Sequence, residues 1–237
     1  MKKLLVKDLG RMDYLAALAL QEKLVELRRA GEVPDTLMLL EHPDVFTIGR
    51  GGKREHALLC GDTPLYRTSR GGDITYHGPG QLIAYPIIDL RSKLRRAVHS
   101  YLRRLERVMI ATLQTFGISA SRKPPWTGIW LGQRKIASIG IAVRRGVTFH
   151  GVALNLSPDL SYFQKIVPCG LSWAEITSME KELEREVSIE AVRDEFLRQF
   201  ARHFGYSELK ELCLEDIPIG SRSDPLATRA TCASSEF

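Results

Sequence analysis

The amino-acid sequence predicts an α+β fold in which a mixed, mainly antiparallel sheet is flanked by helices. Helical and strand-like segments follow one another in mixed order, without the regular strand–helix alternation of a doubly wound parallel sheet. Three consecutive strand-like segments between residues 128 and 156 are separated by tight turns around Gly132 and Gly146, which is typical of antiparallel hairpins.

The N-terminal part of the chain is predicted to contain one helix followed by short strands. Residues 12–30 have helical character, with Asp13 near the start and Gly31 directly after the end, where capping residues belong. Short β-favouring runs follow, separated by turns rich in proline and glycine. These strands are predicted at residues 36–40, 45–48 and 82–88.

Two further helices have clear apolar periodicity. Between residues 97 and 116, apolar side chains recur at helical spacing, arginines occupy much of the other face, and Gly117 ends the run. Residues 188–203 show the same spacing, with Phe196 and Phe200 on the apolar face.

The segments 128–131, 135–143 and 147–156 are predicted as strands. In the second, apolar residues alternate from Ala137 to Val143, and Lys135 opens the strand on the same face. From about Ile217 the composition shifts to Ser, Thr, Pro and Ala. We therefore expect one catalytic domain over residues 1–216 and a poorly ordered tail over residues 217–237.

The composition indicates a globular protein. The chain has 237 residues, of which 44% are hydrophobic and 26% are charged. There is no apolar run of membrane-spanning length, and the N-terminal segment is too short and too charged for a signal peptide, so we expect a cytoplasmic protein. The four cysteines show no spacing typical of metal ligands, so we expect no metal site. We do not expect a disulfide framework in a chain of this size, and we expect no cofactor.

The charge balance favours an acidic partner. The net charge is +6 and the pI is about 9.2. The basic residues are scattered, and no basic run interleaved with aromatic residues indicates a nucleic-acid surface. We expect an acidic protein partner, with a plain solvated surface as the alternative.

A glycine-rich segment, RGGDITYHGPGQ, covers residues 70–81. Its four glycines and one proline are unlike an ordinary strand or helix, and glycine lets a backbone approach a ligand closely. Arg70, Tyr76 and His77 supply polar groups. A ligand-binding loop and a structural turn between two strands are equally compatible with this composition.

The segments GQRKIASIG and FHGVALNL place small residues two apart on strands. Ser138 and Gly140, and likewise Gly151 and Ala153, could form a floor for an alkyl chain or mark close sheet packing. For Lys135, the pattern alone favours an amine that snorkels to water over one that is desolvated beside a partner.

Cys169 lies in the segment IVPCGL, between a proline and a glycine that favour a tight, exposed turn. A lone cysteine is most often a small buried hydrophobe, but a thiol in this setting is a candidate nucleophile. A nearby cation is needed to lower its pKa, and Lys135 is the candidate. The remaining cysteines, Cys60, Cys213 and Cys232, lack such a setting.

Taken together, RGGDITYHGPGQ, RKIASIG, FHGVALNL and VPCGL resemble the octanoyltransferases of lipoate biosynthesis, within the biotin/lipoate protein ligase-like superfamily. The resemblance covers roughly residues 5–210. It implies a biotin/lipoate-ligase-like fold and the transfer of octanoyl from octanoyl-acyl carrier protein to a lysine of lipoyl domains, without ATP. The implied acceptors are the lipoyl domains of 2-oxoacid dehydrogenases and the glycine cleavage H protein, with no nucleic acid and no membrane as partner.

The resemblance also implies roles for individual residues. Cys169 falls on the cysteine that carries the acyl thioester, and Lys135 on the lysine that lowers the pKa of that thiol. Three stretches fall on the substrate-binding positions: Arg70, Gly71, Gly72, Asp73, Ile74, Thr75, Tyr76 and His77; Ser138, Ile139 and Gly140; Gly151, Val152 and Ala153. Asp73 occupies a position where the family pattern varies.

Two enzymatic alternatives remain open at this point. One is an ATP-dependent lipoate or biotin protein ligase, which forms an acyl-adenylate and needs no cysteine. The other is an amidotransferase that moves octanoyl between two lipoyl domains. A non-catalytic module that binds carrier proteins is a third possibility, which the combination of Cys169 and Lys135 disfavours.

Overall fold

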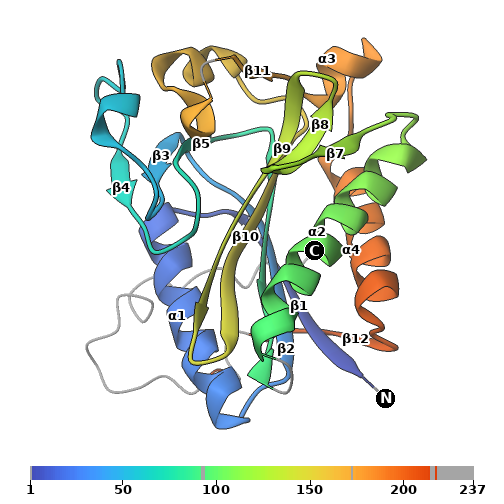
Figure 1. Cartoon of the computed structure of the whole chain (residues 1–237). Coiled ribbons are helices and arrows are strands. Elements are labelled where there is room, and N and C mark those ends of the chain that lie inside the picture. Colours follow the sequence, from blue (N-terminus) through green and yellow to red (C-terminus); the bar gives the residue numbers. More distant parts are fainter. Residues whose placement is uncertain (1, 92–93, 172, 214–216, 218–237) are drawn as a thin grey trace, which may run out of the picture.

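A large mixed sheet crosses the middle of the molecule, and helices cover both of its faces (Figure 1). The computed structural model describes residues 2–91, 94–171, 173–213 and 217. The strand order is β12-β1-β2-β6-β10-β9-β8-β7, with β11 also pairing β9. The strands are β1 (Lys3–Arg11), β2 (Asp35–Glu41), β6 (Gln81–Ile87), β7 (Ser121–Lys123), β8 (Trp126–Leu131), β9 (Arg134–Arg144), β10 (Val147–Asn155), β11 (Glu175–Ile176) and β12 (Glu208–Glu211).

Most neighbours in this sheet are antiparallel, as the hairpins in the sequence predict. The strands β2, β6, β10, β9, β8 and β7 pair successively in antiparallel fashion. β1 runs parallel to both β2 and β12, and β11 runs parallel to β9. The predicted α+β class is therefore confirmed.

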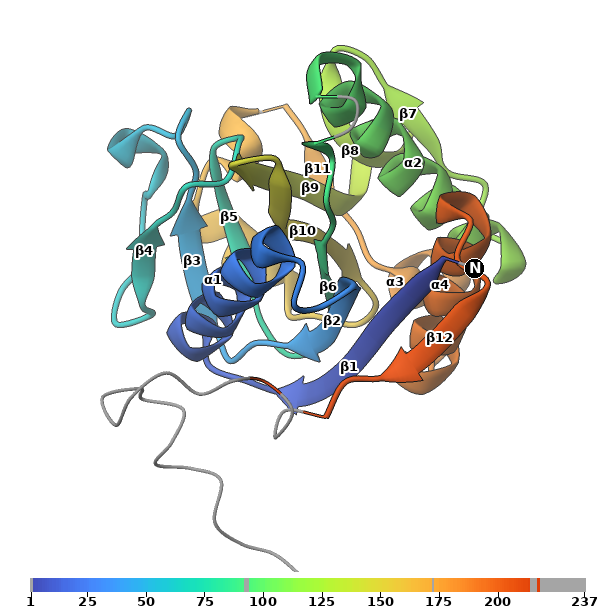
Figure 2. The ribbon, with the colours of Figure 1, turned by 90° about the horizontal axis from the view of Figure 1, so that it is seen from below.

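Helices form a layer on each side of the sheet, which the view from below separates (Figure 2). Helix α1 (Tyr14–Ala30) packs against β10 and β6 on one face. Asp13 caps its N-terminus by accepting from two backbone N–H groups, and Gly31 ends it in the left-handed conformation. Helices α2 (Leu94–Thr115) and α4 (Ile189–Phe204) pack on each other over the opposite face.

Each helical layer covers its own hydrophobic core. The core under α2 and α4 includes Leu105, Phe196 and Phe200, all fully buried. The core under α1 includes Leu20 and Leu24. All three predicted helices are confirmed to within a few residues, because their apolar stripes face these cores.

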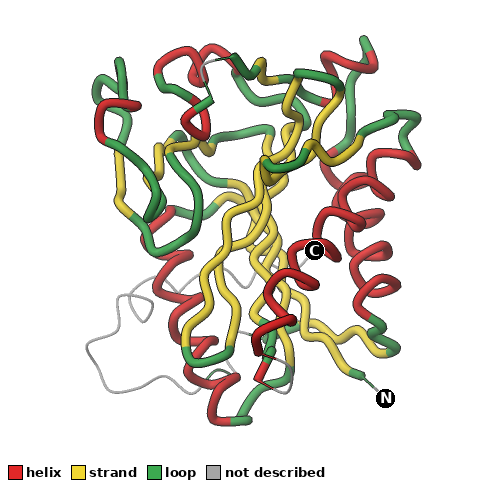
Figure 3. The backbone as a smooth tube through the Cα atoms, viewed as in Figure 1, coloured by secondary structure: helices red, strands yellow, loops and turns green. Residues whose placement is uncertain are grey.

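A smaller sheet lies at one end of the large one, in the order β4-β3-β5. Its strands are β3 (Val45–Ile48), β4 (Leu65–Arg67) and β5 (Ile74–His77). The connecting segments contain the short 3-10 helices η1 (Arg54–His56), η3 (Leu160–Lys165) and η4 (Pro168–Gly170) and the short helix α3 (Met179–Leu183). Loops dominate this end of the molecule (Figure 3).

Some elements were not predicted from the sequence. Strand β1 is one of them, because the charged residues of this segment interrupt the alternation typical of a strand. Of the predicted tail, Ile217 is buried in the core under α1, and residues 218–237 lie outside the described residues. None of the described helices has both the length and the apolar character needed to cross a membrane.

Candidate active site

A cavity of about 240 Å³ lies where the glycine-rich segment meets the strands β9 and β10. Most of the residues that the sequence singled out line it. These are Arg70, Gly72, Asp73, Thr75, His77, Lys135, Ser138, Ile139, Gly140, Gly151, Val152 and Ala153. The fold therefore gathers three segments that are far apart in the sequence into one concave site.

The glycine-rich loop is anchored by Arg70, whose side chain is buried. Its guanidinium donates to the Thr47 carbonyl oxygen at 2.6 Å and to the Thr47 hydroxyl at 2.8 Å. The Gly71 N–H donates to the Ile141 carbonyl oxygen on β9 at 2.8 Å. A side chain on Gly140 would lie only 3.0 Å from Arg70 Cδ, so the loop reaches β9 because this position is glycine.

Residues 74–77 form strand β5, which corrects the expectation that the glycine-rich segment contains no ordinary strand. Its side chains alternate, as in any strand. Ile74 and Tyr76 enter the small-sheet core, where Tyr76 donates to Asp44 at 2.6 Å. Thr75 and His77 line the cavity on the other side. Ile74 and Tyr76 therefore do not line the cavity, and neither does Gly71.

Lys135 is buried, with 4% of its surface exposed, so the expectation that it snorkels to water was wrong. It also lies on the opposite face from the one predicted. A β-bulge inserts Ile136 between the pairs Ala137–Ile129 and Lys135–Trp130. Because side chains alternate along a strand, one extra residue reverses the phase and turns Lys135 toward the cavity.

Trp130 and Gly128 hold the Lys135 side chain. The Nζ atom lies 5.4 Å from the centroid of the Trp130 ring. A Cβ atom on Gly128 would lie 2.6 Å from Lys135 Cε. The aliphatic part of the lysine therefore occupies the space that the missing side chain leaves.

The floor of the cavity consists of cross-strand pairs between β9 and β10. Gly140 pairs with Gly151, and Ser138 pairs with Ala153. These pairs present little side-chain bulk to the cavity, as an alkyl-chain floor requires. These small residues also allow close packing within the sheet, because a side chain on Gly151 would lie 2.1 Å from the Ala84 carbonyl oxygen.

Cys169 lies in η4, in the predicted tight turn, with Gly170 exposed and at a φ of 71°. The chain continues from this turn into β11, where Ile176 pairs with Lys135. Leu171, two residues after Cys169, lines the same cavity as Lys135. The segment that follows the turn therefore pairs with the strand that carries the lysine.

The other cysteines have different surroundings. Cys60 is half-buried, and its burial raises the pKa of its thiol. Cys213 is exposed. Cys232 lies outside the described residues.

Sequence reasoning missed the aromatic residues at the inner end of the cavity. Tyr14 on α1, Tyr85 on β6 and His150 on β10 all line it. Burial raises the pKa of Tyr14 to about 12 and lowers that of His150 to about 3, with Arg70 as a further cause for the latter. Burial lowers the pKa of His77 as well. These rings are neutral at pH 7, so they suit the end of an uncharged chain.

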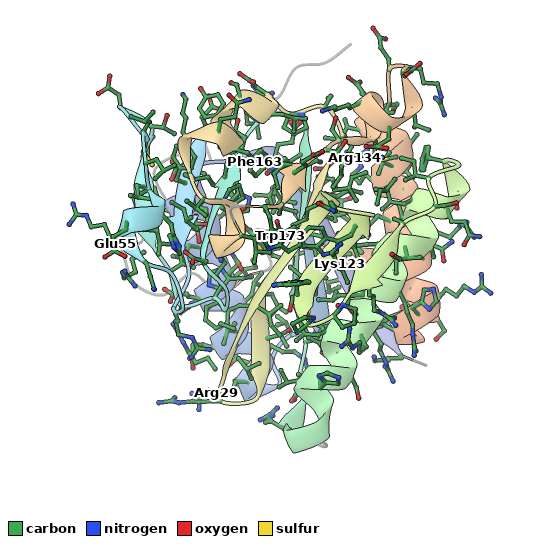
Figure 4. All side chains as sticks on the ribbon, turned by 45° about the horizontal axis from the view of Figure 1, so that its top comes forward. Arg29, Glu55, Lys123, Arg134, Phe163 and Trp173 are labelled. Atoms are coloured by element: carbon green, nitrogen blue, oxygen red, sulfur yellow. The ribbon has the colours of Figure 1, made fainter. Side chains whose placement is uncertain are left out.

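At the outer end, Trp126 lines the cavity and its ring lies 4.8 Å from that of Trp173 in an edge-on arrangement. Both rings are partly exposed. Lys123 extends over Trp173, with Nζ 5.3 Å from the ring centroid (Figure 4). Among the described residues, no group of three or more His, Cys, Asp or Glu side chains could hold a metal ion.

Comparisons with known proteins agree on the family. The lipoyl protein ligase A/B catalytic domain matches residues 13–201. The octanoyltransferase of Solibacter usitatus is 50% identical over 216 residues, covering 88% of this chain and 96% of the relative. The mitochondrial octanoyltransferase of Arabidopsis thaliana is 41% identical over 213 residues, covering 86% of this chain and 90% of the relative.

Solved structures agree on the fold. A bipartite lipoate protein ligase from Thermoplasma acidophilum superposes with a TM-score of 0.70 at 18% identity, covering 91% of this chain and 88% of that one. Lipoate-protein ligase A bound with ATP superposes with a TM-score of 0.67 at 17% identity, covering 91% and 90%. The chain therefore belongs to the lipoyl protein ligase A/B catalytic-domain family, and its relatives place it among the octanoyltransferases, acyltransferases that act in protein lipoylation.

Proposed function

We propose that this chain takes octanoyl from an acyl carrier protein, holds it as a thioester on Cys169, and delivers it to a lysine of a lipoyl domain. One observation carries the proposal. Lys135 and Leu171 line a single cavity, and β11 ties the chain that follows Cys169 to the strand of Lys135. A cation near a thiol favours the thiolate, which is the nucleophilic form.

The proposed reaction has two half-reactions. The Cys169 thiolate attacks the carbonyl carbon of the donor thioester, and the carrier thiolate leaves and takes up a proton. The neutral ε-amine of the acceptor lysine then attacks the acyl-enzyme, the amide forms, and the Cys169 thiolate leaves. Exchange of one thioester for another is nearly isoenergetic and amide formation is downhill, so no nucleotide is required.

A base is needed in the second half-reaction. A lysine ε-amine has an unperturbed pKa of about 10.4, so the acceptor arrives mostly protonated at neutral pH. The acceptor amine gives up one proton to solvent before it attacks, and its nitrogen loses a second proton as the amide forms. Lys135, after passing its own proton to the leaving carrier thiolate, is the proposed acceptor of this second proton. Its burial excludes bulk water from the transfer.

The acyl chain is proposed to lie along the small-residue floor, toward the neutral aromatic end. Gly140, Gly151 and Ala153 leave room above β9 and β10, and Tyr14 and Tyr85 close the inner end. Burial of each CH₂ contributes about 0.8 kcal/mol, so an eight-carbon chain gains roughly 5 kcal/mol there.

The proposed partners are an acidic acyl carrier protein and acidic lipoyl domains. The net charge of +6 supports long-range attraction of both. We also propose that the protein carries out this reaction in the cytoplasm.

The decisive experiment measures octanoyl transfer to a lipoyl domain in the absence of nucleotide. With octanoyl-acyl carrier protein as donor, the wild type should produce the amide, Cys169→Ser should not, and Cys60→Ser and Cys213→Ser should retain activity. A requirement for ATP would instead support the ligase alternative. Transfer only from an octanoylated lipoyl domain would support the amidotransferase.

A further inference from the structure

The turn that carries Cys169 is held by a second segment, η1, which the sequence did not single out. The Val167 N–H donates to the His56 carbonyl oxygen at 2.8 Å. The next residue, Ala57, forms an isolated antiparallel bridge with Ile166. Glu55, labelled in Figure 4, marks this segment at one side of the molecule. The segment therefore runs alongside the chain that enters the turn.

Side chains extend this attachment to the glycine-rich loop. His56 Nδ1 lies 2.6 Å from Asp73 Oδ2, and both side chains are mostly buried. A carboxylate only accepts, so His56 Nδ1 carries the proton and donates. The other oxygen, Asp73 Oδ1, accepts from the Ile74 backbone N–H at 2.6 Å. Asp73 thus links η1 to strand β5.

Gly170 lies against the side chains of His56 and Asp73. A Cβ atom at Gly170 would lie 2.7 Å from Asp73 Oδ2 and 3.3 Å from His56 Cε1. The backbone directly after Cys169 therefore contacts the two side chains at their hydrogen bond. The backbone hydrogen bond of Val167 fixes the chain before Cys169, and the side chains of His56 and Asp73 fix the chain after it.

We propose that His56 and Asp73 are a positioning pair that holds the Cys169 turn against the cavity, a role distinct from the substrate binding predicted for Asp73. This inference rests on the proposed function of Cys169. The hydrogen bond between imidazole and carboxylate is short and involves a charged acceptor, which is the stronger kind. Displacement of a reacting group by about 1 Å can lower a rate about 100-fold.

The two roles for Asp73 predict different kinetics. Asp73 lines the cavity, whereas His56 does not belong to the lining. If the pair positions the turn, His56→Ala and Asp73→Ala should each lower the rate of acyl-enzyme formation at saturating donor by 10-fold to 100-fold, with KM for the donor within about threefold of wild type. The double variant should be no slower than the slower single variant, because both remove the same interaction.

The conservative variant His56→Asn tests whether the hydrogen bond itself matters. Its side-chain amide can donate from near the position of Nδ1, so it should recover most of the lost rate. As a matched control, Arg198→Ala removes an ion pair on α4 in which Arg198 donates two hydrogen bonds to Glu195. This variant should leave both kcat and KM unchanged. Melting temperatures of all variants report folding separately.

Rapid-quench mass spectrometry of the acyl-enzyme measures these rates. The proposal is overturned if Asp73→Ala raises KM while His56→Ala acylates at the wild-type rate, or if His56→Asn is as slow as His56→Ala while both remain folded. These outcomes differ from failure of the proposed function, in which the wild type itself would show no acylation of Cys169.

Discussion

Replacement of Gly128 by alanine tests the placement of Lys135 without removing its amine. Gly128 has a φ of 131°, a conformation that L-residues rarely adopt, and a new Cβ would lie 2.6 Å from Lys135 Cε and 2.7 Å from the Ala137 carbonyl oxygen. Ordinary contacts at such positions are 3.4–4 Å, so the end of the lysine must move by about 1 Å. A shift of that size in a reacting group lowers the rate about 100-fold.

The same substitution also affects stability. Backbone strain costs about 1–3 kcal/mol, and overpacking adds about 1–3 kcal/mol. For a domain of this size, each kcal/mol lowers Tm by roughly 2–4 °C, so Gly128→Ala should melt roughly 10 °C below wild type and still fold.

Gly132→Ala is the matched control, because it lies in the turn of the same β8–β9 hairpin. It has a φ of 63°, and no heavy atom of the described residues beyond its neighbours lies within 4 Å of its would-be Cβ. It should lose about 1 kcal/mol of stability and keep its activity. Nucleotide-free transfer assays and thermal melts on both variants provide the comparison. A folded Gly128→Ala enzyme with a kcat within twofold of wild type would refute the role given to Lys135.

Three further predictions concern the lysine, the sheet and the buried histidines. Lys135→Ala should move the pH profile of alkylation of the reactive thiol by iodoacetamide to higher pH, and an unchanged profile would remove the lysine from thiol activation. Gly151→Ala should lower the free energy of unfolding by about 1–3 kcal/mol or more, because its Cβ would meet the Ala84 carbonyl oxygen at 2.1 Å; a wild-type urea midpoint would contradict this. Burial lowers the pKa of His42 to about 4 and that of His150 to about 3, whereas unfolded histidine titrates near 6.5, so between these values the unfolded chain binds more protons. Stability should therefore be full above about pH 6.5 and fall below it, by up to about 1.4 kcal/mol per pH unit for each histidine, and equal urea midpoints at pH 5.5 and 7.5 would count against it.

Local signals in the sequence account for the elements that were predicted correctly. Asp13 and Gly31 mark the ends of α1 because capping is a local interaction. Apolar periodicity identified α2 and α4, and the glycines at 132 and 146 identified the hairpins. The small residues on β9 and β10 and the turn at Cys169 could also be predicted, because each depends on residues that are close together in the sequence.

The features that were missed depend on contacts between distant segments. The composition and the apolar alternation of the sequence around Ile136 do not indicate a bulge. The bulge nevertheless turns Lys135 to the other face of the strand. Tyr14 and Tyr85 reach the cavity only because α1 and β6 pack against β10. His56 shows its relation to the Cys169 turn only once η1 lies beside it. No pattern among neighbouring residues in the sequence indicates these contacts between distant segments.

The proposed mechanism requires that Cys169 itself carries the octanoyl group. Intact mass spectrometry after exposure to octanoyl-acyl carrier protein, without acceptor and without nucleotide, tests it most directly. If Cys169 forms the thioester, the wild type and Cys60→Ser should each gain the mass of one acyl group and Cys169→Ser should gain none. The adduct should disappear when a lipoyl domain is added. A wild-type enzyme that transfers octanoyl but never gains this mass, or an adduct that persists in Cys169→Ser, would contradict it.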